Sequence, residues 1–224
     1  ETGGFDVWVP LTAQSLLRRH NHGNRALKSA LARRIPSDPD VLAYWPMEDA
    51  DGATQFGSAI TGVPAMTYKG DIDLAAHPGP GGSDDLPVFN EGCSWSAVVP
   101  GPATATNEYQ IEWLVNLQQL TATERTIQRA QTTGSVLTWT FFIDNDSIRV
   151  NGVGRDGTVH VNNTIAFTTT DFLSVWTRWR FRADQNGANV DWSLTLIPIL
   201  GSGGSFSASY AGTAGRVTGV SGVD

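Results

Sequence analysis

The chain has 224 residues, of which 40% are hydrophobic and 17% charged, and its formal net charge is −7. This composition is ordinary for a globular chain with a sizeable core and excludes wholesale disorder. The acidic balance argues against nucleic acid as a partner of the main body. A single cysteine, Cys93, excludes an internal disulfide, and no apolar run approaches the ~18 residues of a membrane span.

Residues 1–39 form a lead-in to the rest of the chain, with helical periodicity in two stretches. Thr12 can cap a short helix over residues 12–20, and Asn24 can cap a second one that Pro36 ends. Six basic residues crowd this stretch: Arg18, Arg19, Arg25, Lys28, Arg33 and Arg34. A DNA-binding pair of helices is one interpretation, but we favour a solvated face or one that docks a neighbouring domain.

From residue 41 onward, apolar and polar residues alternate as in strands. Residues 41–45 read as a first strand that Pro46 stops, whereas residues 50–107 hold short strands at most, with a loop over 76–87. Asn186-Gly187 has the signal of a type I′ hairpin turn. Clear alternation predicts strands over 109–115, 136–143, 147–150, 158–167, 173–183, 190–196, 206–208 and 216–220.

This strand pattern predicts an all-β fold, a jelly-roll sandwich of two antiparallel sheets over residues 40–224, with a short N-terminal helical segment. The first residue is not Met, so we expect the chain to be a piece of a longer protein.

Three segments resemble known families. Residues 42–49, Leu-Ala-Tyr-Trp-Pro-Met-Glu-Asp, with Gly52 and Thr54, resemble the opening strand and turn of laminin-G-like, concanavalin-A-like domains. Residues 16–31 running into Tyr44-Trp45-Pro46 are similar to minor tail proteins of actinobacterial phages and prophages, in which a short basic helical link precedes a jelly roll. Residues 176–181 and the return strand after them are similar to the late hairpin of that jelly roll.

The resemblance implies a component of the virion tail, assembled in the bacterial cytoplasm, whose partners are other tail proteins or domains of the same longer polypeptide. It implies a fold used for glycan or protein contact. In that family another hydrophobic strand usually comes after a segment like 216–220, which leaves open that this chain lacks its last strand.

Glycan binding needs an exposed aromatic ring beside hydrogen-bonding groups, and alternation sets Trp176 alongside Arg178. Glu108, Gln110 and Glu112 share one face of another strand. These five residues are our candidates for glycan contact. They do not make a hydrolase pair, because the middle position is an amide and the two glutamates stand about 13 Å apart along the strand. We therefore name no catalytic residue.

Calcium is the one cofactor that we consider, since hard cations prefer clustered carboxylates and carbonyls on turns. Two turns carry such groups: Glu48, Asp49 and Asp51 in the first, and Asp144 and Asp146 in the second. Neither completes an EF-hand loop. Residues 152–157 read G-x-G-x-x-G, but a strand comes directly after them, which favours a hairpin connection over a dinucleotide site.

The leading hypothesis is a phage minor-tail or tail-tip domain with a structural role or an adhesive role toward host cell-wall polysaccharide. The alternatives are a polysaccharide-degrading glycoside hydrolase on the same fold and a purely structural tail spacer. We expect neither nucleic acid nor a membrane span among its interactions.

Overall fold

The structure is a computed structural model that describes residues 28–81, 83–101, 106–167, 172–199, 205–215 and 217–224. The helix predicted over 12–20 lies outside the described residues, as does the start of the second helix. The described part of that second helix is α2 (Ala30–Arg34), after which comes the 3₁₀ turn η1 (Ile35–Ser37). Ser29 caps α2, because its hydroxyl accepts a hydrogen bond of 3.1 Å from the Ala32 amide.

The rest of the described chain is strands and connections. Within those residues the strands are β1 (Gln55–Phe56), β2 (Met66–Lys69), β3 (Ile72–His77), β4 (Leu86–Phe89), β5 (Ser94–Val98), β6 (Glu108–Asn116), β7 (Arg125–Gly134), β8 (Val136–Ile143), β9 (Ser147–Gly154), β10 (Val159–Ala166), β11 (Trp176–Asn186), β12 (Asn189–Pro198), β13 (Phe206–Ala214) and β14 (Val217–Val223).

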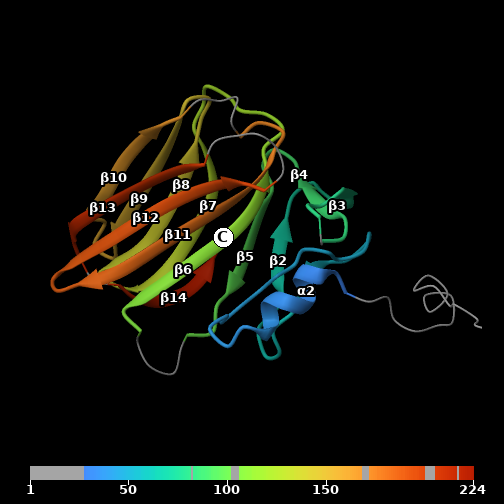
Figure 1. Cartoon of the computed structure of the whole chain (residues 1–224), viewed down its shortest axis with the longest axis horizontal. Helices are drawn as coiled ribbons and strands as arrows, with labels where there is room; N and C mark the ends of the chain where they lie inside the picture. The colour runs from blue at the N-terminus through green and yellow to red at the C-terminus, as the bar shows by residue number, and fades with distance from the viewer. Residues whose placement is uncertain (1–27, 82, 102–105, 168–171, 200–204, 216) are drawn as a thin grey trace, which may run out of the picture.

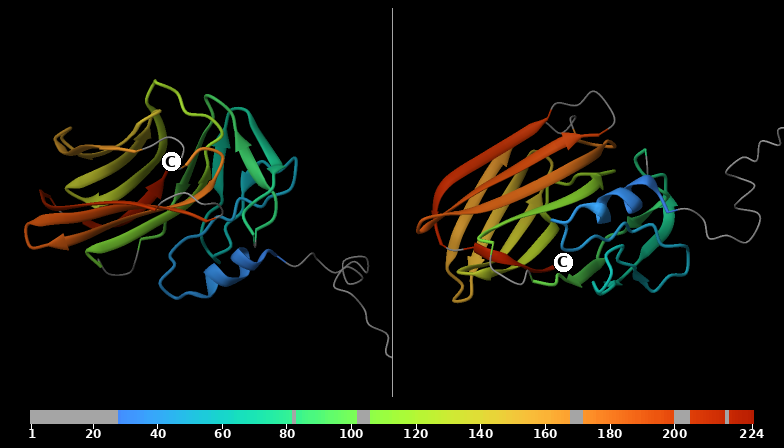
Figure 2. Two further views of the ribbon diagram at one scale, coloured as in Figure 1. Left: turned by 45° about the horizontal axis from the view of Figure 1, so that its top comes forward. Right: turned by 60° about the horizontal axis from the view of Figure 1, so that its bottom comes forward.

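These strands form one sheet in the order β1-β2-β5-β14-β7-β8-β9-β10, a second in the order β13-β12-β11-β6, and a small β3-β4 hairpin (Figure 1). All the pairs within these sheets are antiparallel. Figure 2 shows β7–β10 of the larger sheet and the four-stranded sheet as two facing layers. The predicted all-β antiparallel sandwich with a short helix near the N-terminus is confirmed. The strand β14 lies inside the larger sheet, between β5 and β7.

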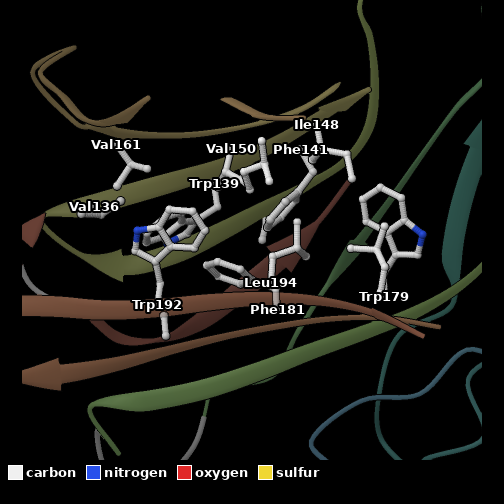
Figure 3. Close-up of a cluster of buried hydrophobic side chains, with 14 of the residues drawn as sticks. Val136, Trp139, Phe141, Ile148, Val150, Val161, Trp179, Phe181, Trp192 and Leu194 are labelled. Carbon is white, nitrogen blue, oxygen red and sulfur yellow. The ribbon is translucent and has the colours of Figure 1, made fainter. Parts of the chain in front are cut away.

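The two sheets face each other across an aromatic core. Side chains of β8–β10 point toward those of β11 and β12 (Figure 3). Trp139, Phe141 and Phe181 are fully buried, and the Phe181 ring centroid lies 4.8 Å from that of Trp139 and 4.9 Å from that of Phe141. Such contacts add to the large apolar area that each ring buries. A second cluster is formed by residues of β1, β2, β5 and β14, among them Phe56 and Met66.

The prediction of a strand over residues 41–45 is wrong, because residues 41–50 have no regular secondary structure. The backbone carbonyl of Tyr44 accepts a bond of 2.9 Å from the Ala59 amide, and the indole of Trp45 donates to the Pro64 carbonyl at 2.9 Å. Met47 then takes a positive φ of 58°, which turns the chain. The alternation here reflects packing of Trp45 and Met47 on the second cluster, without any partner strand.

Two further details differ from the prediction. The hairpin between β11 and β12 has Gly187 and Ala188 as its central residues, since Asn186 pairs with Asn189. Gly187 has a φ of +61° at the first central position, whereas the φ of Ala188 at the second is not positive. This is the pattern of a type II′ turn and not of the predicted I′ turn, which needs a positive φ at both positions. The loop predicted over 76–87 is shorter, because β3 extends to His77 and β4 begins at Leu86.

Candidate functional site: the outer face of the four-stranded sheet

The outer face of the four-stranded sheet carries all five predicted glycan-contact residues. Odd-numbered residues of β11, such as Trp179 and Phe181, are buried in the core, so the even-numbered ones point outward. On β6 the even-numbered residues share that outer face. The register places Arg178 opposite Leu114 and Arg180 opposite Glu112. The structure therefore brings together on one face Glu108, Gln110, Glu112, Trp176 and Arg178.

A network of ion pairs occupies the middle of this face. Arg178 holds Glu112 with two hydrogen bonds of 2.7 Å each, and Arg180 donates to the same carboxylate at 2.8 Å. The Gln110 amide donates a further bond of 2.6 Å to Glu112. Bidentate guanidinium–carboxylate pairs fix the planes of both groups, so the Arg178 side chain is held in place before any ligand arrives.

Arg182 forms a second centre of charge further along the strand. It contacts Asp184 at 2.9 Å on its own strand and Glu108 at 3.1 Å on β6. These side chains are more exposed, with 52% of Arg182 and 59% of Glu108 accessible. Opposite Asp184 on β12 lies Asp191. Hydrogen bonds from the Gly212 amide and the Asn186 side chain hold the pKa of Asp191 below its usual range. This end of the face is therefore acidic.

The opposite end of the face is apolar and aromatic. Trp176 is half-buried, and its ring meets that of His77 edge-on at a centroid distance of 5.8 Å. Leu114 and Ile199 are 36% and 40% exposed, and Ile197 lies opposite Arg178. The half-buried indole of Trp176 thus lies two positions along β11 from the guanidinium of Arg178, on the same face. That arrangement can stack against an apolar ring face and hydrogen-bond its hydroxyl groups.

Part of this face was not predicted from the sequence. The outward residues of β12 and β13 include Thr195 and Ser193, which pair with Ser207 and Ser209. These four residues extend the outer face across β12 and β13, and each of them contributes a hydroxyl group. The alternation of β12 contains this information, because its even-numbered residues from Val190 to Leu196 are all buried.

The structure gives most of the carboxylates of the calcium prediction local partners. Glu48 accepts a bond of 2.6 Å from the Ser29 hydroxyl, and Asp49 accepts one of 3.1 Å from the Gly57 amide. Asp51 is an exposed turn residue. Nowhere in the described part of the chain do three or more His, Cys, Asp or Glu side chains gather as a metal site.

Asp144 and Asp146 form an Asx turn. Asp144 accepts bonds from the Asp146 amide at 3.0 Å and from the Ser147 amide at 2.7 Å. Burial acts to raise the pKa of Asp144, but these hydrogen bonds and the one from the Ser147 hydroxyl outweigh it, so the pKa is lowered. The Asp144 carboxylate therefore serves the turn between β8 and β9.

Residues 152–157 cover the end of β9 and most of the turn into β10, so they belong to a hairpin as predicted. β9 ends at Gly154 and β10 begins at Val159, and the Gly154 amide donates a bond of 2.8 Å to the Thr158 carbonyl. A strand, and no helix, comes after the glycines, so the geometry of a dinucleotide site is absent from this segment.

The structure also holds a hollow away from the predicted residues. It measures about 330 Å³ and lies in the eight-stranded sheet where β5, β14 and β7 meet. Its lining includes Ser96, Val98, Gln131 and Ser221.

Comparison with known proteins places the chain in no family: no family model matches it, and neither does any curated protein or solved structure. Among the helical residues that the structure describes, no helix has the length and apolar character needed to cross a membrane. The fold and the site together define an all-β antiparallel sandwich with an ion-paired sheet face that ends in a half-exposed tryptophan.

Proposed function

We propose that this chain is a non-catalytic, carbohydrate-binding adhesion domain of a phage minor-tail or tail-tip protein. The observation that carries the adhesive role is the half-buried Trp176 at the end of an open sheet face, in line with the guanidinium of Arg178 that Glu112 holds rigid. The tail context rests on the resemblance of residues 16–31 and 44–46 to phage minor tail proteins.

The chemistry of the face suits a sugar polymer. A pyranose ring has an apolar C–H face that packs on an indole and equatorial hydroxyls that pair with charged or amide groups. Trp176 supplies the first contact, and Arg178, Asn116 and Gln110 lie within the same two strands to supply the second. A flat sheet face gives only a shallow site, so we expect weak binding by one domain and strong binding by the several copies on a tail.

The carboxylates of the described chain do not support the hydrolase alternative. A glycosidase needs a general acid with a raised pKa beside a second carboxylate. Glu112 instead lies between two guanidinium groups. Among the described carboxyl groups, hydrogen bonds lower the pKa of Glu124, Asp144, Asp156 and Asp191. These groups are held in the anionic form, which suits binding and structure more than proton donation.

Calorimetric titration of the protein with purified actinobacterial cell-wall polysaccharide tests the proposal. We expect saturable binding to the wild type and binding about tenfold weaker for Trp176→Ala, with most affinity kept by Trp176→Phe. Leu42→Ala, at a residue 42% exposed outside the sheet, is the matched control and should bind like the wild type. Unchanged binding by Trp176→Ala would contradict the assignment of the site.

Two additions to the same experiment separate the other hypotheses. Reducing ends released from the polysaccharide during the titration would contradict a non-catalytic role and favour the hydrolase. Absence of binding to any wall fraction by a folded sample would leave the structural spacer as the better account. Repetition with a chelator tests the calcium prediction, since loss of binding would place the ion at the site.

A further inference from the structure

The outer face of the eight-stranded sheet carries a second ordered array of polar side chains. Across β7, β8, β9 and β10 the register aligns Arg129 with Thr140, Thr140 with Asn151, and Asn151 with Asn162. The adjacent aligned row, Ala130, Trp139, Gly152 and Val161, is buried in the core, so the polar row lies on the outer side of the sheet, although Thr140 itself is buried there. With strands about 4.8 Å apart, the row runs about 14 Å across four strands.

A neighbouring row extends the array toward the hollow. Gln131 lies opposite Thr138 on β8 and also lines the 330 Å³ hollow between β5, β14 and β7. We name Arg129, Gln131, Thr138, Asn151 and Asn162 the polar ladder. Gln131, Arg129 and Asn162 are exposed, whereas Thr138 and Asn151 are half-buried. The hollow has the volume of a small ligand pocket and is open to solvent, so the ladder ends in a shallow depression.

One member of the ladder has an unused hydrogen-bonding group. The Oδ1 atom of Asn151 is shielded from solvent and has no hydrogen-bond partner. A shielded oxygen without a hydrogen bond destabilises the folded protein. If the amide turns outward, a hydroxyl group of a ligand can donate to this oxygen and remove that cost.

The charges of this face are balanced. Arg129 pairs with Asp224 at 3.1 Å. Arg149 forms a bidentate pair with Glu124 at 2.5 and 2.7 Å while its guanidinium covers the Phe142 ring at 4.0 Å. The remaining ladder members are amides and a hydroxyl. A face with paired charges and many neutral donors and acceptors complements a neutral polyhydroxyl chain, whereas a polyanion would also meet the net charge of −7.

We propose that the polar ladder and the adjoining hollow form a second polysaccharide-binding surface, for a neutral chain that crosses the strands and places one sugar in the hollow. This surface lies on the opposite layer from Trp176 and does not depend on it (Figure 2). A single domain with two such faces bridges two polysaccharide chains, which adds to the avidity of a multicopy tail.

Backbone amide NMR shifts of the full chain, titrated with oligosaccharides of arabinogalactan as a neutral probe, test this proposal. We expect shifts on β7–β10 as well as on β6 and β11. The double variant Gln131→Ala/Asn162→Ala changes two exposed positions. It should weaken the affinity measured from the β7–β10 shifts by roughly fivefold for each lost bond and leave the affinity measured from the β6 and β11 shifts unchanged. Ser94→Ala, at an exposed serine of β5, is the matched control.

The outcomes separate the two surfaces. Shifts confined to β6 and β11 would overturn the second surface and leave the Trp176 site standing. Shifts confined to β7–β10 and abolished by the double variant would support the second surface and contradict the first. A stronger response of β7–β10 to polygalacturonate than to the neutral probe would overturn the proposed neutral ligand.

Discussion

Glu112 is the residue whose replacement tests the geometry of the candidate face most sharply. Its carboxylate accepts bonds of 2.7, 2.7 and 2.8 Å from two arginines and retains 30% exposure. In Glu112→Gln the anion is lost, and one polar end of the new amide presents donors to guanidinium donors. Exposed ion pairs contribute up to about 1 kcal/mol each, and those with bidentate geometry lie at the upper end. We therefore expect a loss of about 1–2 kcal/mol in the free energy of unfolding.

Glu108→Gln is the matched control on the same strand. Glu108 makes one contact of 3.1 Å with an arginine that Asp184 also holds, and it is 59% exposed. Its replacement should cost less than about 0.5 kcal/mol. Urea unfolding monitored by tryptophan fluorescence measures both values. At about 1 M salt, where screening acts within ~3 Å, the difference between the variants should shrink. Equal stabilities of the two variants at low salt would show that the ion pairs of Glu112 with Arg178 and Arg180 do not stabilise the fold.

Three other predictions concern the core, the cap and the acid response. Phe181→Ala removes a fully buried ring between Trp139 and Phe141 and should lower the free energy of unfolding by about 3–5 kcal/mol in urea titrations; a loss below about 1 kcal/mol would contradict the described core. Ser29→Ala removes the cap of α2 and should cost about 1 kcal/mol, seen as faster amide exchange at Ala32 than in the wild type. The hydrogen bond from Arg149 lowers the pKa of Glu124. The stability that this ion pair contributes is therefore present above about pH 4.5, the ordinary pKa of the carboxyl group, and is lost as the pH falls through the lowered pKa. Acid unfolding of Glu124→Gln should depend less steeply on pH than that of the wild type, and an unchanged slope would count against the pair.

Strands with large inward side chains could be predicted from the sequence. The strand β8 matches its predicted range because Trp139, Phe141 and Ile143 alternate with outward residues. The same reasoning on β6 and β11 placed the candidate glycan residues on outward positions. Alternation of this kind reports burial directly, since each inward position removes apolar surface from water.

The strand β7 was missed because its inward residues are small or polar. Gln128, Ala130 and Thr132 are buried, and their sequence pattern does not differ from that of a solvated segment. The structure makes this burial tolerable with hydrogen bonds: the Gln128 side chain donates to the Arg129 carbonyl at 3.1 Å, and the Thr132 hydroxyl donates to the Val136 carbonyl. Such partners depend on the fold and leave no local signal.

The pairing within the candidate face was equally hidden. Arg178 and Glu112 are 66 positions apart, and they meet only because β11 lies beside β6 in a particular register. A one-residue slip of β11 against β6 would turn the Arg178 side chain into the core and break the pair. The polar ladder depends on register in the same way, across four strands.

Oxidative footprinting of the tryptophans, read by mass spectrometry, measures whether bound polysaccharide covers Trp176. Trp176 and Trp95 are both half-buried, but Trp95 lies on β5 of the other sheet, with its ring 4.7 Å from that of Phe89. Saturating cell-wall polysaccharide should slow the oxidation of Trp176 several-fold and leave that of Trp95 unchanged. Equal oxidation of Trp176 with and without bound polysaccharide would show that Trp176 is not the contact residue.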